Sequence, residues 1–322
     1  MKSLALLTSG GDGPGMNSAV RAIVRTAIGA GIGVWGVNRG YAGLLEGDML
    51  EMSVSSVGNI LQRGGTILKT SRCPEFMHKE ARREAGNILR RKKIDALIVL
   101  GGNGSFNGAM LFYDETGIPV VGIPGSIDND IEGSEYSIGF NTAVQTAVEA
   151  VDKIKDTAAS HARIFIVEVM GRNSPAIALH VGVCTGAEYV VLPSKEVDIT
   201  EVANQLQRGI SRGKTSSIVI VAEGPEAGLS YRIKADLEKE HQLQSHVCIL
   251  GHIQRGGVPT VTDRFIAAEM GHLAVKAILE GKMPTATVYR NGQVVLAPLE
   301  ECLEKKISFD PKYIELSQCL SI

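Results

Sequence analysis

Seven short runs of apolar residues recur along the chain, and most of them end in glycine, proline or a small polar residue. The runs are Leu4–Leu7, Ala96–Leu100, Val120–Ile123, Ile164–Val169, Tyr189–Leu192, Ile218–Ala222 and Val247–Leu250. They lack the strict alternation of apolar and polar residues that is typical of half-exposed strands. We therefore predict strands that are buried on both faces.

Helical patterns lie between these runs. Asn17–Ala30 and Asn141–Asp156 each place alanine, valine or isoleucine along one helical face. Alternating strands and helices predict right-handed crossovers and a mainly parallel sheet, which is an α/β fold. Ligands of such folds bind at the carboxyl ends of the strands, so these ends are the places to search for function.

The composition excludes several classes of protein. A length of 322 residues predicts about two domains, and a net charge of −2 gives no basic field for nucleic acid or a membrane surface. No apolar run approaches the roughly 18 residues of a membrane span, and the N-terminal run is too short for a signal peptide. The five cysteines form no C-x-x-C pair, which argues against a zinc site or a disulfide framework and predicts a cytoplasmic protein.

Two glycine-rich clusters follow predicted strands. Ser9–Asn17 (SGGDGPGMN) joins the first strand to a helix, and Gly101–Ser105 (GGNGS) follows a later strand. Backbone N–H groups at a helix N-terminus form an anion site, so the two loops predict that each holds part of a polyphosphate. The alternative for the first cluster is a tight turn that Asn17 caps.

Standard nucleotide-binding fingerprints do not account for these clusters. Gly31–Gly36 matches G-x-G-x-x-G, but it is expected to precede a strand, whereas a dinucleotide-binding fingerprint follows one. Gly209–Thr215 resembles a P-loop but is one residue short between its glycines, so we identify no Walker A motif.

A pair of aspartates carries the most informative chemical signal. Asp128 and Asp130 lie two residues apart in Pro124–Asp130 (PGSIDND), directly after a predicted strand. Carboxylates in this position suit proton abstraction or the handling of Mg²⁺. The alternative is a pair of Asx turns.

Three further strand ends bear polar residues, namely Glu168–Arg172 (EVMGR), Glu223–Gly224 and His252–Gly257 (HIQRGG). Arg255 offers a planar fork for a phosphate, and Glu223 can accept hydrogen bonds from sugar hydroxyls. Solvated loop residues are the plain alternative. Taken together, the strand ends predict phosphoryl transfer from a nucleotide to a hydroxyl of a phosphorylated small molecule.

In this order, the motifs SGGDxPGMN, GGxGS, PGxIDND, EVMGR and GHIQRGG resemble those of the bacterial ATP-dependent 6-phosphofructokinases. The resemblance implies two αβα sandwich (Rossmann-like) domains with mainly parallel sheets. Residues 1–138 with 255–304 would bind the nucleotide, and residues 139–254 with 305–322 would bind the sugar phosphate. It also implies a cytoplasmic, allosteric homotetramer of glycolysis that uses ATP with Mg²⁺ to phosphorylate the 1-hydroxyl of fructose 6-phosphate.

The resemblance assigns roles to individual residues. Asp128 would be the catalytic base, and Arg72 and Arg172 would offset the charge that develops during transfer. The nucleotide site would contain Gly11, Arg72, Cys73, Gly102, Asn103, Gly104 and Ser105. The sugar-phosphate site would contain Ser126, Asp128, Asp130, Arg163, Met170, Gly171, Arg172, Glu223, His246, His252 and Arg255, with Arg163 contributed by a neighbouring subunit. The effector site would contain Arg21, Arg25, Lys155, Glu188, Arg212 and Lys214.

Four positions depart from the family pattern. Asn103 stands where the family has an aspartate that supports Mg²⁺, so the metal site would rest on Asn103 and, indirectly, on Asp130. The lost charge would lower the rate by roughly 10²–10³-fold. His246 replaces an arginine that binds the 6-phosphate, Val54 replaces an effector-binding arginine, and Ser174-Pro175-Ala176 alters a loop.

These departures leave two alternatives to an active ATP-dependent 6-phosphofructokinase. One is a catalytically impaired paralogue that binds nucleotide and sugar phosphate as a regulatory subunit. The other is a kinase for a different ketose phosphate. Gly104 favours ATP as the donor, because relatives that use pyrophosphate typically carry an aspartate at this position, which obstructs the nucleotide.

Overall fold

The computed structural model describes residues 1–161, 163–193, 196–224, 228–303 and 312–321. The chain forms two compact units. Unit 1 comprises Met1–Thr142 and Arg255–Lys306, and unit 2 comprises Ala143–Gln254 and Ile307–Ile322. The predicted division at 304/305 lies outside the described residues.

Unit 1 contains a seven-stranded sheet in the order β11-β10-β5-β4-β1-β2-β3. Its strands are β1 (Ser3–Ser9), β2 (Gly33–Val37), β3 (Met49–Met52), β4 (Ala96–Gly101), β5 (Val120–Pro124), β10 (Thr285–Arg290) and β11 (Gln293–Pro298). The five central strands are parallel, and the antiparallel strands β3 and β11 form the two edges.

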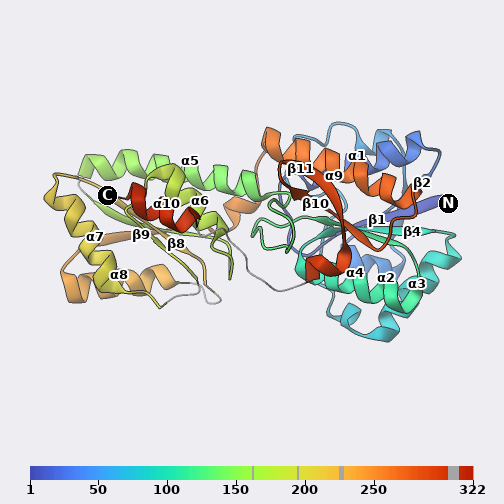
Figure 1. Cartoon of the computed structure of the whole chain (residues 1–322), viewed down its shortest axis with the longest axis horizontal. Helices are drawn as coiled ribbons and strands as arrows, with labels where there is room; N and C mark the ends of the chain where they lie inside the picture. Colours follow the sequence, from blue (N-terminus) through green and yellow to red (C-terminus); the bar gives the residue numbers. More distant parts are fainter. Residues whose placement is uncertain (162, 194–195, 225–227, 304–311, 322) are drawn as a thin grey trace. The chain divides into compact units, whose positions relative to one another are not determined.

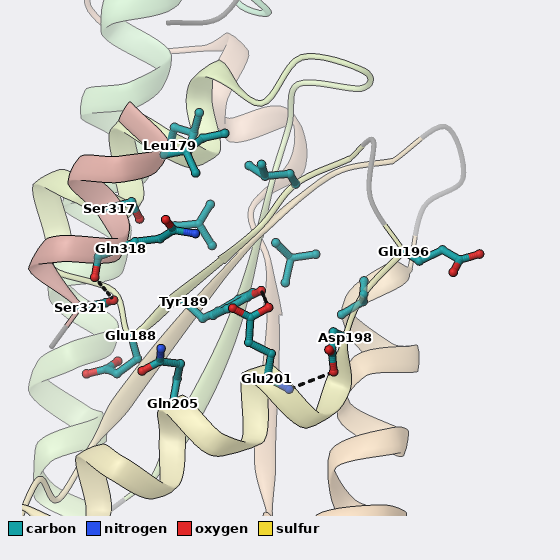
Figure 2. A pocket seen from close by; sticks show the side chains of 15 residues that line it. Leu179, Glu188, Tyr189, Glu196, Asp198, Glu201, Gln205, Ser317, Gln318 and Ser321 are labelled. Carbon is teal, nitrogen blue, oxygen red and sulfur yellow. Dashed lines mark hydrogen bonds between the residues drawn. The ribbon is translucent and has the colours of Figure 1, made fainter. Parts of the chain in front are cut away.

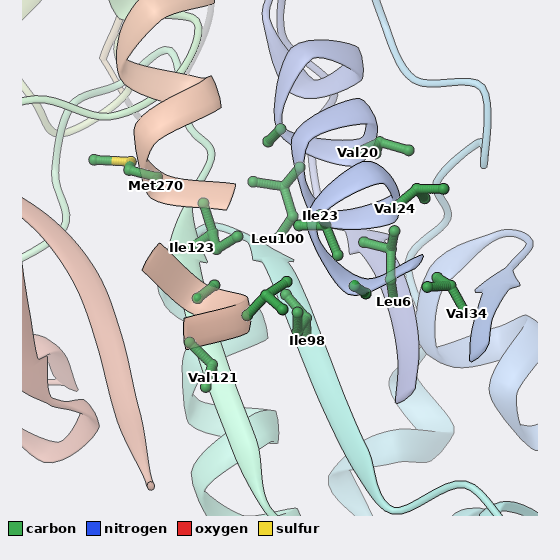
Figure 3. Packing of buried hydrophobic residues seen from close by; sticks show 14 of the residues in the cluster. Leu6, Val20, Ile23, Val24, Val34, Ile98, Leu100, Val121, Ile123 and Met270 are labelled. Atoms are coloured by element: carbon green, nitrogen blue, oxygen red, sulfur yellow. The ribbon is translucent and has the colours of Figure 1, made fainter. Parts of the chain in front are cut away.

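Helices cover both faces of this sheet (Figure 1). They are α1 (Met16–Gly29), α2 (Gly40–Glu46), α3 (Lys79–Arg91), α4 (Asn103–Thr116) and α9 (Val261–Leu279). On the face covered by α1 and α9, the α1 residues Val20, Ile23 and Val24 and the α9 residue Met270 pack in one buried cluster with Leu6 of β1 (Figure 3). Helices α2, α3 and α4 bury a second cluster on the opposite face.

Unit 2 contains a four-stranded, fully parallel sheet in the order β7-β8-β6-β9. Its strands are β6 (Ile164–Val169), β7 (Tyr189–Val191), β8 (Ser217–Ala222) and β9 (Ser245–Ile249). The other α-helices that the structure describes are α5 (Phe140–His161), α6 (Ala176–Thr185), α7 (Ile199–Ser211), α8 (Leu229–His241) and α10 (Lys312–Leu320). Short 3₁₀ helices occur in both parts of the chain, and the described ones are η1 (Ser55–Val57), η2 (Pro74–Met77), η3 (Gly251–Arg255) and η4 (Leu299–Leu303). Within the described ranges, no helix has the length and apolar character needed to cross a membrane.

The predicted α/β class with mainly parallel sheets is confirmed, and all seven predicted strands are present. Three further strands, β3, β10 and β11, were not predicted. The strand expected after Gly31–Gly36 is β2, but it begins at Gly33, inside this segment. The segment follows helix α1 and not a strand, unlike a dinucleotide-binding fingerprint. A Cβ on Gly36 of β2 would lie 2.7 Å from the sulfur of Met52 and 2.8 Å from Cδ2 of Leu68, so a larger residue would require these side chains to shift.

Asn17 does not cap α1, contrary to the alternative considered for the first glycine cluster. The N-cap is Gly15, whose φ of 101° lies in the left-handed region that favours glycine. Asn17 is buried in the first turn, where its Nδ2 donates to the carbonyl of Arg63 at 3.0 Å and its Oδ1 accepts from the N–H of Ile67 at 2.8 Å. Asn17 thus fixes a distant loop against the start of α1.

A buried carboxylate joins the starts of α5 and α9. Asp263 is 1% exposed, and its oxygens accept the N–H of Gly139 at 2.8 Å and the N–H and hydroxyl of Thr142 at 2.8 and 2.5 Å. Thr260, the N-cap of α9, accepts the N–H of Asp263 at 3.2 Å. Asp263 therefore supplies hydrogen-bond acceptors for N–H groups at the start of α5 that have no partner within the helix.

Asp263 leads to a prediction about stability and pH. Burial raises the pKa of its carboxyl above the ordinary value of 3.8, although the hydrogen bonds from Thr142 and Gly139 act in the opposite direction. The folded chain therefore keeps this proton to a higher pH than the unfolded chain. The contribution of Asp263 to the free energy of unfolding should fall as the pH rises from about 4 through the folded-state pKa.

We expect Asp263→Asn to remove this pH dependence. The variant should also lose about 1–3 kcal/mol at acidic pH, because an amide nitrogen would face N–H donors. Urea unfolding of both proteins from pH 4 to pH 8 measures the difference. Parallel stability curves over that interval would contradict the prediction.

Candidate active site

The three predicted strand-end loops of unit 1 lie side by side. Strands β1, β4 and β5 are neighbours, so Ser9 pairs with Gly101, and Gly101 pairs with Pro124. The N–H of Gly125 donates to the carbonyl of Gly101 at 3.0 Å. Both glycine clusters and the aspartate loop therefore meet at the carboxyl edge of the sheet, where α/β folds bind ligands.

The two glycine clusters pack so closely that one position, Gly101, has no room for a side chain. A Cβ on Gly101 would lie 2.5 Å from the carbonyl oxygen of Ser9 and 2.8 Å from the Cβ of Ser105. By contrast, apart from its two chain neighbours and the backbone of α4, no atom of the described residues lies within 4 Å of the Cβ position at Gly104. Helix α4 begins at Asn103 with Gly102 as its N-cap, so its first N–H groups are available to an anion.

A hydrogen-bond network links the aspartate loop to the second glycine cluster. Nδ2 of Asn103 donates to the carboxylate of Asp130 at 2.9 Å and to its carbonyl at 3.1 Å. Oγ of Ser126 donates to the other carboxylate oxygen of Asp130 at 3.3 Å and accepts the N–H of Asp128 at 3.2 Å. Both carboxylate oxygens of Asp130 thus have partners, and Ser126 fixes the backbone at Asp128.

The aspartate loop fits a Mg²⁺ ion that arrives with a nucleotide. Among the described residues, no group of three or more His, Cys, Asp and Glu side chains is arranged to hold a metal ion. Mg²⁺ in phosphotransferase sites typically binds one or two carboxylates together with substrate phosphates and water, so a complete protein cage is not required. Asp130 suits that role, whereas Asn103 presents an N–H donor to Asp130 and supplies no negative charge.

The segment that carries Arg72 and Cys73 returns to the first glycine cluster. Oγ1 of Thr70 donates to the carbonyl of Gly10 at 2.7 Å. Arg72 is exposed, and Cys73 is partly buried. Burial raises the pKa of the Cys73 thiol, so this group stays neutral near pH 7 and is no candidate for a nucleophile.

The strand-end residues of unit 2 also meet at a carboxyl edge. Strand β6 lies between β8 and β9, the N–H of Glu223 donates to the carbonyl of Val169 at 2.8 Å, and the N–H of Leu250 donates to that of Glu168 at 3.0 Å. The predicted residues on these adjoining loops are Met170, Gly171, Arg172, Glu223 and His252.

Gln254, which the sequence reasoning did not select, holds the loop after β6. Its side chain is fully buried, and its Oε1 accepts the N–H of Met170 at 2.9 Å. Next in this loop, Gly171 has a φ of 143° and Arg172 a φ of 49°, a conformation that arginine rarely adopts. Backbone strain of this kind is concentrated at functional sites, which favours a functional role for Arg172.

The two glutamates at this edge differ in their hydrogen bonds. Glu168 is 2% exposed and accepts the N–H and hydroxyl of Ser230 at 3.1 and 2.5 Å, which stabilises the start of α8. Oε2 of Glu223 is buried and has no hydrogen-bond partner among the described residues. A buried acceptor requires a donor, which a ligand hydroxyl can supply.

Arg163 and His246 lie at the opposite edge of the unit 2 sheet. His246 pairs with Phe165 near the start of β6, and Arg163 directly precedes this strand. Arg172 follows the opposite end of β6. A strand of this length spans about 20 Å, because each residue of an extended strand adds about 3.3 Å. A single copy of unit 2 therefore does not bring Arg163 and His246 together with Arg172.

Three of the residues predicted for an effector site line one pocket of unit 2. Glu188, Arg212 and Lys214 surround a cavity of about 170 Å³, and Lys214 forms an ion pair with Glu188. Arg208 also lines this cavity. Sequence reasoning missed Arg208, although it lies one helical turn before Arg212.

The other three predicted effector residues lie elsewhere. Lys155 donates to the carbonyl of Thr185 and does not line the pocket. Arg21 and Arg25 lie one turn apart on α1, which belongs to unit 1.

A larger pocket of about 220 Å³ shares Glu188, Gln205 and Ser321 with the first. Tyr189 donates to Glu201 at 2.8 Å inside it, and side chains of α10 line another wall (Figure 2). None of the predicted catalytic residues lines this pocket. The predicted active site is thus identified by the chemistry of the strand ends and not by cavity size.

Comparisons with known proteins agree on one family. A family model of phosphofructokinase matches residues 3–278. The chain is 49% identical to the ATP-dependent 6-phosphofructokinase of Thermoanaerobacter sp. (strain X514), with complete coverage of both chains. It is 48% identical, again over both complete chains, to the enzyme of the same name from Clostridioides difficile (strain 630).

Solved structures give the same result. Phosphofructokinase from Saccharomyces cerevisiae matches with a TM-score of 0.88 and 38% identity over 94% of this chain, which spans 45% of the yeast chain. A pyrophosphate-dependent phosphofructokinase from Marinobacter aquaeolei matches with a TM-score of 0.85 over 100% of this chain and 92% of its own, but at 20% identity it supports the fold alone. On the evidence of its strand-end loops and of these full-length matches, the chain belongs to the phosphofructokinase family.

Proposed function

We propose that this chain is an ATP-dependent 6-phosphofructokinase, which transfers the γ-phosphoryl group of ATP to the 1-hydroxyl of fructose 6-phosphate. The observation that carries the proposal is the meeting of the aspartate loop and two glycine clusters at one edge of a parallel sheet. Phosphoryl transfer requires positioning, charge neutralisation and a group that orients the nucleophile, and these loops provide such groups. The names of the bacterial relatives support this donor and this acceptor.

The residues of unit 1 bind the nucleotide and activate the sugar. N–H groups near Gly11 and at the start of α4 bind the phosphates, and Asp128 accepts the proton of the sugar hydroxyl. Arg72 offsets the charge that develops during transfer, and the resemblance gives Arg172 the same role. Asp130 would be the residue that holds, indirectly, the Mg²⁺ bound with ATP, and this ion would supply neutralisation of phosphate charge.

The residues of unit 2 bind the sugar phosphate. The loops with Met170, Arg172, Glu223 and His252 contact it. Oε2 of Glu223 has no hydrogen-bond partner among the described residues, which supports a hydrogen bond from a sugar hydroxyl. Arg163 and His246 lie at the other edge of the sheet, so we assign them to the sugar phosphate of a second copy of this chain. That assignment requires self-association, for which the resemblance implies a homotetramer.

The same resemblance supports the rest of the proposal. Unit 1 is the nucleotide-binding domain, unit 2 is the sugar-phosphate domain, and the enzyme acts in glycolysis in the cytoplasm. The cavity between Glu188, Arg212 and Lys214 supplies three of the residues for an allosteric effector site.

Release of ADP by the purified protein tests this function. With MgATP, release should exceed about 1 s⁻¹ only when fructose 6-phosphate is added. Binding of both ligands without release would instead favour the regulatory paralogue. Release that depends on another ketose phosphate would favour the other acceptor.

Gly104→Asp tests the choice of donor. The Cβ position at Gly104 is open, so the fold should tolerate a side chain there, whereas a carboxylate would repel nucleotide phosphates. We expect kcat/KM for ATP to fall at least tenfold, about 1.4 kcal/mol, with little change in the melting temperature. Gly104→Asn adds similar bulk without charge, and an equal loss in both variants would contradict the electrostatic explanation.

A further inference from the structure

The turn between β10 and β11 supports the segment of chain that follows the aspartate loop. Arg290 and Gln293 form the last pair of this hairpin, and Asn291 and Gly292 between them have φ values of 51° and 78°. Two-residue turns with positive φ match the twist of the strands that they join. The end of β10 is therefore a well-defined place for another segment to bind.

Residues 133–135 bind there through backbone and side-chain hydrogen bonds. The N–H of Glu135 donates to the carbonyl of Tyr289 at 2.8 Å, and the N–H of Tyr289 donates to Oγ of Ser134 at 3.0 Å. The N–H of Asn291 donates to the carboxylate of Glu135 at 3.1 Å. In addition to its pairing with β5, β10 thus holds a second segment of unit 1.

Arg290 adds a side-chain contact to this arrangement. Its Nε donates to the carbonyl of Gly133 at 2.5 Å, and its Nη2 donates to the carboxylate of Glu301 in η4 at 3.2 Å. A Cβ on Gly133 would overlap Nη2 of Arg290, so the guanidinium packs directly on the backbone of residues 133–135. The side chain of Glu301 is 51% exposed, so its ion pair contributes little, and the bond to Gly133 is the more important contact.

Asn129 connects residues 133–135 to the two aspartates. It lies between Asp128 and Asp130 with a φ of 49°, a left-handed conformation that asparagine tolerates better than most residues. Its Nδ2 donates to the carbonyl of Glu135 at 3.1 Å, and its Oδ1 accepts the N–H of Ser137 at 2.8 Å. The conformation of the chain beside both aspartates therefore depends on the segment that β10 holds.

We propose that Arg290 is a positioning residue for Asp128, and that it acts through residues 133–135 and Asn129. This inference rests on the proposed function, and it adds a residue that lies outside the loops proposed to bind the substrates. A displacement of about 1 Å can lower the rate of a catalysed reaction by about 100-fold. Contacts that fix the position of the base can therefore affect catalysis without touching a substrate.

A double-mutant cycle with Asp128→Asn tests this proposal. Arg290→Met keeps the length of the side chain and removes its donors, so kcat should fall about 10-fold while KM for each substrate changes less than about twofold. In the Asp128→Asn background, the same substitution should lower kcat less than about twofold, because no base is left to misplace. Equal losses of kcat in both backgrounds, or a rise in KM alone, would overturn the proposal.

Two companion variants separate the contacts of Arg290. In Arg290→Gln, the amide nitrogen stands as many bonds from the backbone as the Nε of arginine, so it can donate to the carbonyl of Gly133. Its kcat should return to within about threefold of the wild type. Glu301→Gln is the matched control, since it removes the ion pair alone and should leave kcat unchanged. An Arg290→Gln variant as slow as Arg290→Met would overturn the proposal.

Failure of the proposed function gives a different result from failure of this inference. If the wild-type protein shows no turnover, the proposed function fails, and amide hydrogen exchange still tests the positioning. In peptides that cover residues 126–138, exchange should be faster in Arg290→Met than in the wild type, and slower again in Arg290→Gln. Exchange in these peptides that is unchanged by Arg290→Met would overturn the proposal.

Discussion

Replacing Asp128 by asparagine should lower kcat by roughly 10²–10⁴-fold, because the amide cannot accept the proton of the sugar hydroxyl. Asparagine has nearly the same shape, so the N–H of residue 128 keeps its hydrogen bond to Ser126 and the loop stays in place. KM for both substrates should therefore change much less than kcat. Steady-state kinetics with ATP and fructose 6-phosphate measure the two constants separately.

Asp114→Asn is the matched control for this experiment. Asp114 is exposed on α4 and far along the helix from the strand-end loops, so its replacement should leave both constants unchanged. A rise in KM at constant kcat for Asp128→Asn would contradict the assignment of Asp128 as the base. Such a result would place Asp128 among the binding groups alone.

Replacing Asn103 by aspartate should make the stability of the protein depend on Mg²⁺. In the native chain, Nδ2 of Asn103 donates to the carboxylate of Asp130 at 2.9 Å. An aspartate at position 103 would replace this hydrogen bond by two carboxylates in contact, which require a cation between them. In a chelator, we expect a loss of about 2 kcal/mol, or about 4–8 °C in the melting temperature.

Addition of Mg²⁺ without nucleotide should restore the melting temperature of Asn103→Asp and leave that of the wild type unchanged. At saturating Mg²⁺ the new ligand should also raise kcat, at most by the 10²–10³-fold that one charge beside the metal can contribute. Asn107→Asp is the control, since Asn107 lies one turn further on α4 and, among the described residues, donates to the carbonyl of Asn103 alone. A melting temperature of Asn103→Asp that is insensitive to Mg²⁺ would contradict this view of the site.

The sequence predicted the central strands and the loops at their ends, because both depend on local patterns. A run such as Ala96–Leu100 is buried on both faces, and its apolar residues leave few alternatives to a strand. The edge strands β3 and β11 escaped prediction because they are partly exposed and pair antiparallel with a single neighbour. Their existence depends on that neighbour and not on their own composition.

The role of individual site residues depended more strongly on tertiary contacts. Asn17 has the position and residue type of a cap, but its partners Arg63 and Ile67 lie about fifty residues further along the chain. Arg163 and His246 are residue types that can bind phosphate, yet the sheet places them at the edge opposite Arg172. No local pattern indicates such distances, because they follow from how strands pair.

The interruption of unit 1 in the sequence has a consequence for the order in which the protein folds during synthesis. Unit 1 is interrupted in the sequence, and β10, β11 and α9 complete its sheet and core only after residue 255 has been made. Until then, the apolar residues of α1 that contact α9 lack this partner, although others pack on β1, and β5 lacks its neighbour β10. Unit 1 therefore stays incomplete while residues 143–254 are synthesised. During this period its exposed apolar surface and unpaired strand edge favour aggregation and chaperone binding.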